Sequence, residues 1–174
     1  MRLPWIDSKP DIDTLIKIIE NNTDPRDSKY WQAILDLGEN GKGNSRAIAL
    51  LSQLCHNNND EFIVMRAAES LYEIDPENPL IVITCTNIAK QSSHYDLVKE
   101  AVVLLGQMYN KVSENKDEII KTLTHIIQQY YEKSVVWHTA KILGKIEPKN
   151  SIAIGTRLGK IEVEIKIKCL SWHK

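Results

Sequence analysis

The sequence has few aromatic residues and no long apolar run. Aromatic residues make up only 6% of the 174 residues, which suits helices that pack through Ala, Leu, Ile and Val. No stretch approaches the roughly 20 apolar residues needed to span a bilayer. The first residues also lack the apolar core of a secretory signal. We therefore expect a cytoplasmic chain without a membrane-spanning segment.

Cysteine is scarce as well. The three cysteines, Cys55, Cys85 and Cys169, are odd in number and far apart in the sequence. Because they include no CxxC pair, neither a disulfide framework nor a thiolate metal site is predicted. Cys55 and Cys85 fall in apolar helical stretches, where a free cysteine usually packs as a small buried hydrophobe.

The motifs of common enzyme chemistry are also missing. The five histidines include no HExxH motif and no pair four residues apart that would form a metal-binding face. His138, next to Trp137, is interpreted as a satisfied structural histidine. The turn 38–44 differs from a phosphate loop because Lys42 lies between two glycines and no strand precedes it. We predict no enzymatic activity, no cofactor, and no catalytic, cofactor-binding or metal-binding residues.

The sequence does contain an internal repeat. Its leading residue recurs as Leu37, Leu71, Leu105 and Leu143, in steps of 34, 34 and 38 residues. Such a period indicates stacked helical hairpins, each of which buries its apolar face against its neighbours. The four leucines are therefore predicted structural repeat positions in the core.

Residues after these leucines are typical of a turn between two helices. Asn44, Asn78 and Asn150 stand where a side-chain oxygen caps the following helix. Gly38 and Gly144 directly follow a repeated leucine. We expect both glycines to end the first helix of the hairpin in the left-handed conformation, which a Cβ would disfavour.

The repeat resembles HEAT-like repeats. The resemblance lies in the run Ala67-Ala68-Glu69-Ser70-Leu71, in the Ile-Asp-Pro-x-Asn or Gly-Lys-Gly-Asn turn, and in the Ala-Ile or Ile-Val that follows. It covers about Asp11 to Leu158 and is weakest at the turn Tyr109–Val112. More narrowly, the pattern looks like the repeats behind NACHT-type NTPase domains of cyanobacterial signalling proteins, which are related to those of phycobilisome bilin lyases.

A tetratricopeptide stack is the alternative fold, since it shares the period of 34 residues. Aligning its closing proline on Pro76 puts Ile48, Ser52, Val64 and Leu71 where Trp, Gly, Ala and Ala are expected. These mismatches favour the HEAT-like interpretation.

The predicted fold is all-α, a right-handed α-solenoid of about four HEAT-like helical hairpins in a single domain, 1–174. We expect a lone helix at 8–22, repeats at 27–56, 60–90, 95–132 and 134–160, and an irregular tail at 161–174. The first helices of these repeats are predicted near 28–37, 61–72, 95–108 and 134–143. In the tail, isoleucine and valine alternate with charged residues, a period of two that favours a strand.

Charge is unevenly distributed along the chain. The net charge is −1, but residues 1–87 carry 8 basic and 14 acidic side chains, and residues 88–174 carry 14 basic and 9 acidic ones. This pattern is typical of a solvated helical surface. The alternative interpretation is self-association through opposite-charged ends, or an anionic partner at the C-terminal half. The small net charge argues against nucleic-acid binding.

The predicted function is a non-enzymatic protein–protein interaction scaffold with a protein partner that the sequence does not identify. Every repeated residue has a structural role, so the repeat itself points to no chemistry. The resemblance implies one alternative, a bilin lyase-like accessory protein for attaching the chromophore of a phycobiliprotein. The lone first helix and the incomplete last repeat indicate a fragment or relative of a larger signalling protein.

Overall fold

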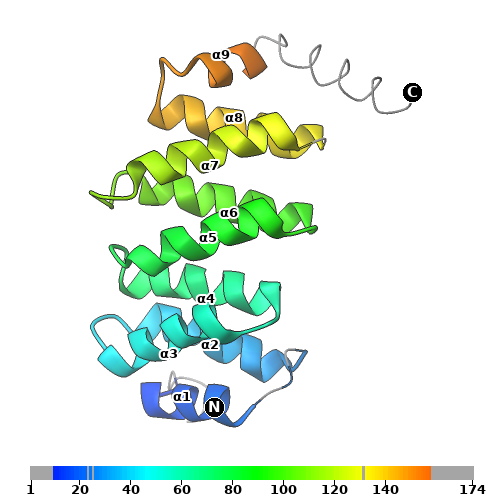
Figure 1. Cartoon of the computed structure of the whole chain (residues 1–174). Helices are drawn as coiled ribbons and strands as arrows, with labels where there is room; N and C mark the ends of the chain where they lie inside the picture. The colour runs from blue at the N-terminus through cyan, green and yellow to red at the C-terminus, as the bar shows by residue number, and fades with distance from the viewer. Residues whose placement is uncertain (1–9, 23, 25, 131, 158–174) are drawn as a thin grey trace, which may run out of the picture. The chain divides into compact units, whose positions relative to one another are not determined.

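The computed structural model describes residues 10–22, 24, 26–130 and 132–157 (Figure 1). All regular structure in these ranges is helical, which confirms the all-α prediction there. The helices are α1 (Ile12–Asn21), α2 (Ser28–Asn40), α3 (Ser45–Asn57), α4 (Glu61–Ile74), α5 (Pro79–Gln91), α6 (Tyr95–Met108), α7 (Lys116–Gln129), α8 (Lys133–Ile146) and α9 (Ser151–Arg157). The strand expected in the tail lies outside the described residues.

The chain divides into two compact units at Asn78 and Pro79. In the first unit, α4 packs against α2 and α3, and α1 packs against α2. In the second unit, α5 packs along α6 and α7 along α8, while α6 also contacts α8 and α5 contacts α7. Each unit is therefore built of two helical layers. The division of the sequence into repeats within a single domain stays a prediction.

Helix α4 shows how the sequence builds the core of the first unit. Because α4 contacts both α2 and α3, it needs an apolar surface wider than one narrow stripe. Its buried residues meet that need: Ile63, Met65, Ala67, Ala68, Ser70, Leu71 and Ile74. The small residues among them let the neighbouring helices approach closely.

Gly38 lies inside α2 and does not end it, so its predicted left-handed conformation is wrong. The helix continues to Asn40 and is capped by Gly41, whose φ is −85°. A Cβ at Gly38 would lie 2.8 Å from the Cβ of Ser70 on α4. Gly38 therefore allows close helix packing. Gly144 also lies within its helix, α8.

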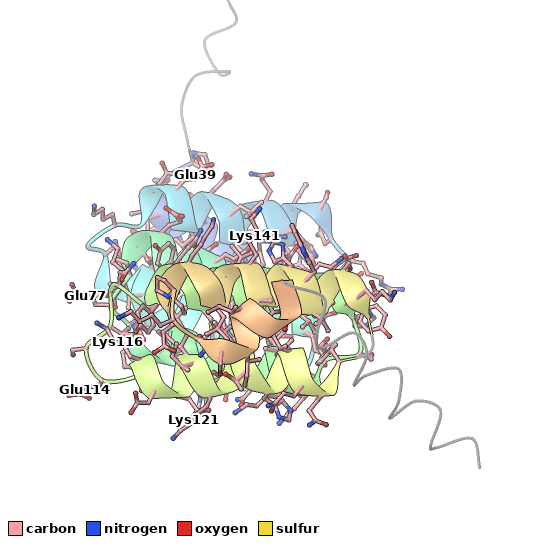
Figure 2. The ribbon with its side chains drawn as sticks, turned by 90° about the horizontal axis from the view of Figure 1, so that it is seen from above. Glu39, Glu77, Glu114, Lys116, Lys121 and Lys141 are labelled. Atoms are coloured by element: carbon pink, nitrogen blue, oxygen red, sulfur yellow. The ribbon has the colours of Figure 1, made fainter. Side chains whose placement is uncertain are left out.

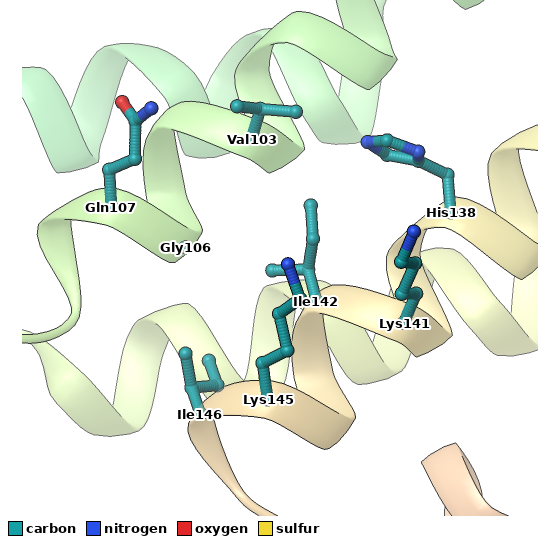
Figure 3. A pocket seen from close by; sticks show the side chains of 8 residues that line it. All are labelled: Val103, Gly106, Gln107, His138, Lys141, Ile142, Lys145 and Ile146. Carbon is teal, nitrogen blue, oxygen red and sulfur yellow. The ribbon is translucent and has the colours of Figure 1, made fainter.

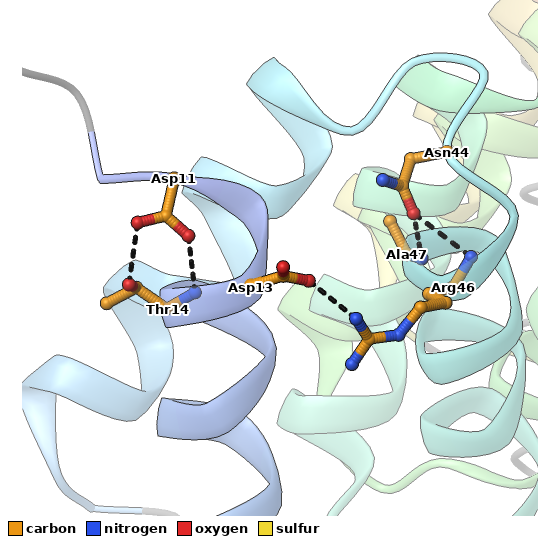
Figure 4. A network of polar contacts seen from close by, with 6 residues as sticks. All are labelled: Asp11, Asp13, Thr14, Asn44, Arg46 and Ala47. Carbon is orange, nitrogen blue, oxygen red and sulfur yellow. Dashed lines mark hydrogen bonds and ion pairs between the residues drawn. The ribbon is translucent and has the colours of Figure 1, made fainter.

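Asparagine and aspartate side chains cap the N-termini of several helices. The Asn44 side-chain oxygen accepts hydrogen bonds from the backbone N–H groups of Arg46 and Ala47, at 3.0 and 3.1 Å (Figure 4). Asp11 accepts from the backbone N–H of Thr14 at 2.9 Å and from its hydroxyl at 2.8 Å. These two bonds hold the pKa of Asp11 below its usual value. Local capping thus sets where the helices start.

An ion pair joins α5 to α7 in the second unit. The Lys90 ammonium donates a hydrogen bond to the Glu118 carboxylate at 2.8 Å. That hydrogen bond, helped by the positive charge of Lys90, lowers the pKa of Glu118. Both side chains are partly exposed, so solvent screens the interaction.

We expect the free energy of unfolding to fall as the pH drops below about 4.5. The folded-state pKa of Glu118 lies below its usual 4.5. The pair therefore stabilises the fold above that pH, and the stabilisation is lost as the pH falls through the folded-state value. In urea titrations, Glu118→Gln should lower the free energy of unfolding at neutral pH by about 0.5 kcal/mol. The variant should then lose less stability than the unchanged chain when the pH is lowered.

The control for this titration is Glu114→Gln, which removes one charge from an exposed position before α7 (Figure 2). It should leave the acid sensitivity of unfolding close to that of the unchanged chain. Equal acid sensitivity in the Glu118→Gln variant and the unchanged chain would contradict the stabilising role of the pair.

Candidate functional site

A hollow of about 300 Å³ opens between α6 and α8 in the second unit (Figure 3). Its lining combines apolar and small residues with basic and polar ones, and no acidic side chain is among them. The lining residues are Val103, Gly106 and Gln107 of α6, and His138, Lys141, Ile142, Lys145 and Ile146 of α8. We call it the α6–α8 hollow.

Gly106 and Ile142 set the spacing of the two helices at the hollow. A Cβ at Gly106 would lie 2.5 Å from the Cγ2 methyl of Ile142. An isoleucine in a helix has one strongly preferred χ1 rotamer, so this methyl has little freedom to move aside. The absence of a side chain at Gly106 therefore lets Ile142 occupy the space beside the α6 backbone (Figure 3).

Basic side chains gather on the α8 side of the hollow. Trp137, Lys141 and Lys145 are spaced by four residues, so they lie on one face of the helix. The Lys141 ammonium lies 5.5 Å from the centre of the Trp137 ring, in a cation–π contact. From Lys133 to Ile146 the helix carries lysine and histidine but no acidic residue. The hollow is therefore electropositive on this side.

His138 contributes a polar atom to the same lining. Its Nε2 is buried and has no hydrogen-bond partner within the part of the chain that the structure describes. The expected satisfied structural histidine is thus not found at this nitrogen. A buried polar atom left unpaired costs about 1–3 kcal/mol, so a bound group that pairs with Nε2 would recover part of that energy.

Trp31 and Trp137 stand at equivalent positions, six residues before Leu37 and Leu143, which predicts core or groove packing for both, but their surroundings differ. Trp31 on α2 is partly buried, and the Arg66 guanidinium of α4 lies 5.6 Å from its ring centre. Trp137 is 56% exposed, so it does not pack in the core. Trp137, Lys141 and Lys145 were not predicted as a group. Their spacing of four within an acid-free helix was the signal that could have identified them.

The first unit has a second hollow, of about 570 Å³, lined by residues of α1, α2, α3 and the loop before α4. Asp60 lines it but caps α4 by accepting from the backbone N–H groups of Phe62 and Ile63. Tyr30 also lines it, and burial, followed by the charge of Asp60, raises the pKa of its hydroxyl. Tyr30 is therefore neutral at physiological pH. Asp60 therefore has a local structural role as the cap of α4.

The predicted structural repeat positions lie outside both hollows. The four leucines, Leu37, Leu71, Leu105 and Leu143, are all fully buried. The Asn150 side-chain oxygen accepts from the N–H groups of Ile152 and Ala153, as Asn44 does at α3. The Asn78 amide donates to the Asp75 carboxylate at 2.9 Å. These residues build helices and turns and do not gather at a site.

Two kinds of feature are absent from the described ranges. No three or more His, Cys, Asp or Glu side chains in these ranges are grouped so that they could hold a metal ion. No described helix is long and apolar enough to cross a membrane. Cys55 and Cys85 are buried in α3 and α5, which agrees with their predicted packing as small buried hydrophobes.

Fold and site together define an all-α protein of layered helices with a basic, partly apolar hollow in its second unit. No protein-family model matches the chain, and no curated protein matches its sequence.

Proposed function

We propose that this chain is a non-enzymatic protein–protein interaction scaffold, a cytoplasmic right-handed α-solenoid of about four HEAT-like hairpins. The two-layer packing within each unit and the asparagine caps of α3 and α9 support the repeat interpretation. The observation that carries the functional part is the exposure of Trp137 beside the α6–α8 hollow.

Single exposed apolar residues are common on protein surfaces and need no explanation. Trp137 differs because it is large and lies next to a concave, partly apolar surface. Val103, which lines that surface from α6, is also exposed, at 36%. Tryptophan is enriched among the residues that dominate binding energy at protein interfaces, and such residues cluster in well-packed pockets from which water is excluded. An apolar centre with a polar rim is the usual anatomy of an interface.

Capture of a partner by the full chain tests the proposal. The tagged chain would be used as bait in an extract of its source organism, with brief cross-linking to retain weak complexes. Each captured protein would then be purified, and its dissociation constant for the chain measured by calorimetry. We expect at least one partner to bind with a defined stoichiometry. If no captured protein binds the purified chain, the proposal is wrong.

A further inference from the structure

We infer that the α6–α8 hollow binds an acidic segment of the partner protein. A large apolar side chain of that segment would rest on Ile142, and its carboxylates would pair with Lys141 and Lys145. This inference rests on the proposed function and adds the chemistry of the partner and the place where it binds.

The size and lining of the hollow favour a short segment over a flat contact. Its volume of about 300 Å³ is at the lower end of ligand pockets, which hold about 300–1,000 Å³, and therefore suits a few side chains. Val103, Ile142 and Ile146 supply its apolar lining. The exposed Trp137 ring extends the apolar surface along α8.

The charges of the hollow select the sign of the partner. Lys141 and Lys145 are one helical turn apart and extend from α8 toward the same opening (Figure 3). Each ammonium group offers up to three hydrogen-bond donors, and the lining holds no acidic side chain to neutralise them. An acidic segment would complement this charge. A polar group of the bound segment would also give the buried His138 Nε2 the hydrogen bond it lacks.

The apolar lining argues for a protein segment over a free anion, since a phosphate would pair with the lysines but would leave Ile142 and Trp137 uncovered. The small net charge of the chain, −1, argues against a nucleic acid. The competing occupant is a second copy of this chain, because residues 1–87 carry a net charge of −6 (8 basic and 14 acidic side chains). The experiment therefore distinguishes a separate partner from self-association.

The probes are random short peptides displayed on phage and selected on the immobilised full chain. Selected peptides would be synthesised with a fluorescent label, and their affinities measured by anisotropy. We expect them to carry several Asp or Glu residues around one large apolar residue. The double variant Lys141→Glu/Lys145→Glu should weaken their binding about tenfold or more. Binding to the unchanged chain should also weaken as salt is added.

Lys116→Glu/Lys121→Glu is the matched control, with the same charge change on α7. Figure 2 shows Lys121 and Lys141 on opposite sides of the second unit. The control is also matched in its ring contact, because Lys116 lies over the Tyr109 ring as Lys141 lies over the Trp137 ring. This control should bind the peptides nearly as well as the unchanged chain. Trp137→Ala should weaken binding. Because Trp137 is exposed, this substitution should leave the core intact and the circular dichroism spectrum unchanged.

Three results would overturn the inference. Selection could return no acidic peptides, or peptides that bind Lys141→Glu/Lys145→Glu as tightly as the unchanged chain. The purified chain could also associate with itself through a contact that this variant abolishes, which would make the occupant a second copy. In the first two cases a partner captured from the extract would leave the proposed function standing, because that test does not depend on the hollow.

Discussion

Replacing Leu71 by alanine is expected to lower the free energy of unfolding by about 2–5 kcal/mol. Leu71 is fully buried in α4, which packs against both α2 and α3. Truncation removes the transfer free energy of the lost side-chain atoms and leaves a cavity between helices that relax only in part. Because domains are stable by only about 5–15 kcal/mol, urea unfolding followed by circular dichroism should show a clear shift to lower denaturant.

Leu35→Ala is the matched control, with the same chemical change on α2 in the same unit. Leu35 is 37% exposed, so its truncation loses less buried area and leaves no closed cavity. We expect a loss below about 1 kcal/mol, in proportion to the smaller area removed from water. Equal losses in the two variants would show that Leu71 does not pack in the core as described.

The second large effect is expected at Gly38. Alanine is favoured over glycine within a helix by about 1 kcal/mol, so helix propensity alone predicts stabilisation by Gly38→Ala. Packing predicts the opposite, because the added Cβ would lie 2.8 Å from the Cβ and 2.9 Å from the Cα of Ser70. Backbone atoms cannot rotate away, so α2 and α4 must separate. We expect a net loss of about 1–3 kcal/mol.

A compensating substitution tests the cause of that loss. Ser70→Gly removes the side-chain atoms nearest to the new methyl group and should recover part of the stability of the Gly38→Ala variant. A double-mutant cycle measured by urea unfolding would give the coupling free energy of the two positions, which for residues in contact is about 0.5–3 kcal/mol. Additive effects, or stabilisation by Gly38→Ala alone, would contradict the close approach of the two helices.

Much of the helical structure could be predicted because its causes are local. The helix predicted near 95–108 is found as Tyr95–Met108, and the one predicted near 61–72 as Glu61–Ile74. Helical periodicity of apolar residues and capping side chains act over a few neighbouring residues. The same local signals placed the end of α2 too early. Gly38 follows a leucine, which predicts a helix end, but in the structure it lies within α2 and packs against Ser70 of α4.

The candidate site could not be predicted in the same way. Its shape depends on Gly106 meeting Ile142, as the packing of the first unit depends on Gly38 meeting Ser70. Each pair joins residues far apart in sequence, and only their separation in space shows that a side chain would not fit. Trp31 and Trp137 have equivalent positions in the sequence, yet Trp31 is partly buried and Trp137 is largely exposed. Sequence position alone could not distinguish them.

By itself, then, the amino-acid order determined the all-α class in the described residues, the approximate extent of the helices and the sites of their polar caps. These properties follow from periodicity and from hydrogen bonds between near neighbours. Tertiary structure alone decided which glycines allow close packing, which tryptophan faces solvent and where basic side chains border an apolar hollow. Those outcomes depend on the distance between helices, which packing sets and no single segment encodes.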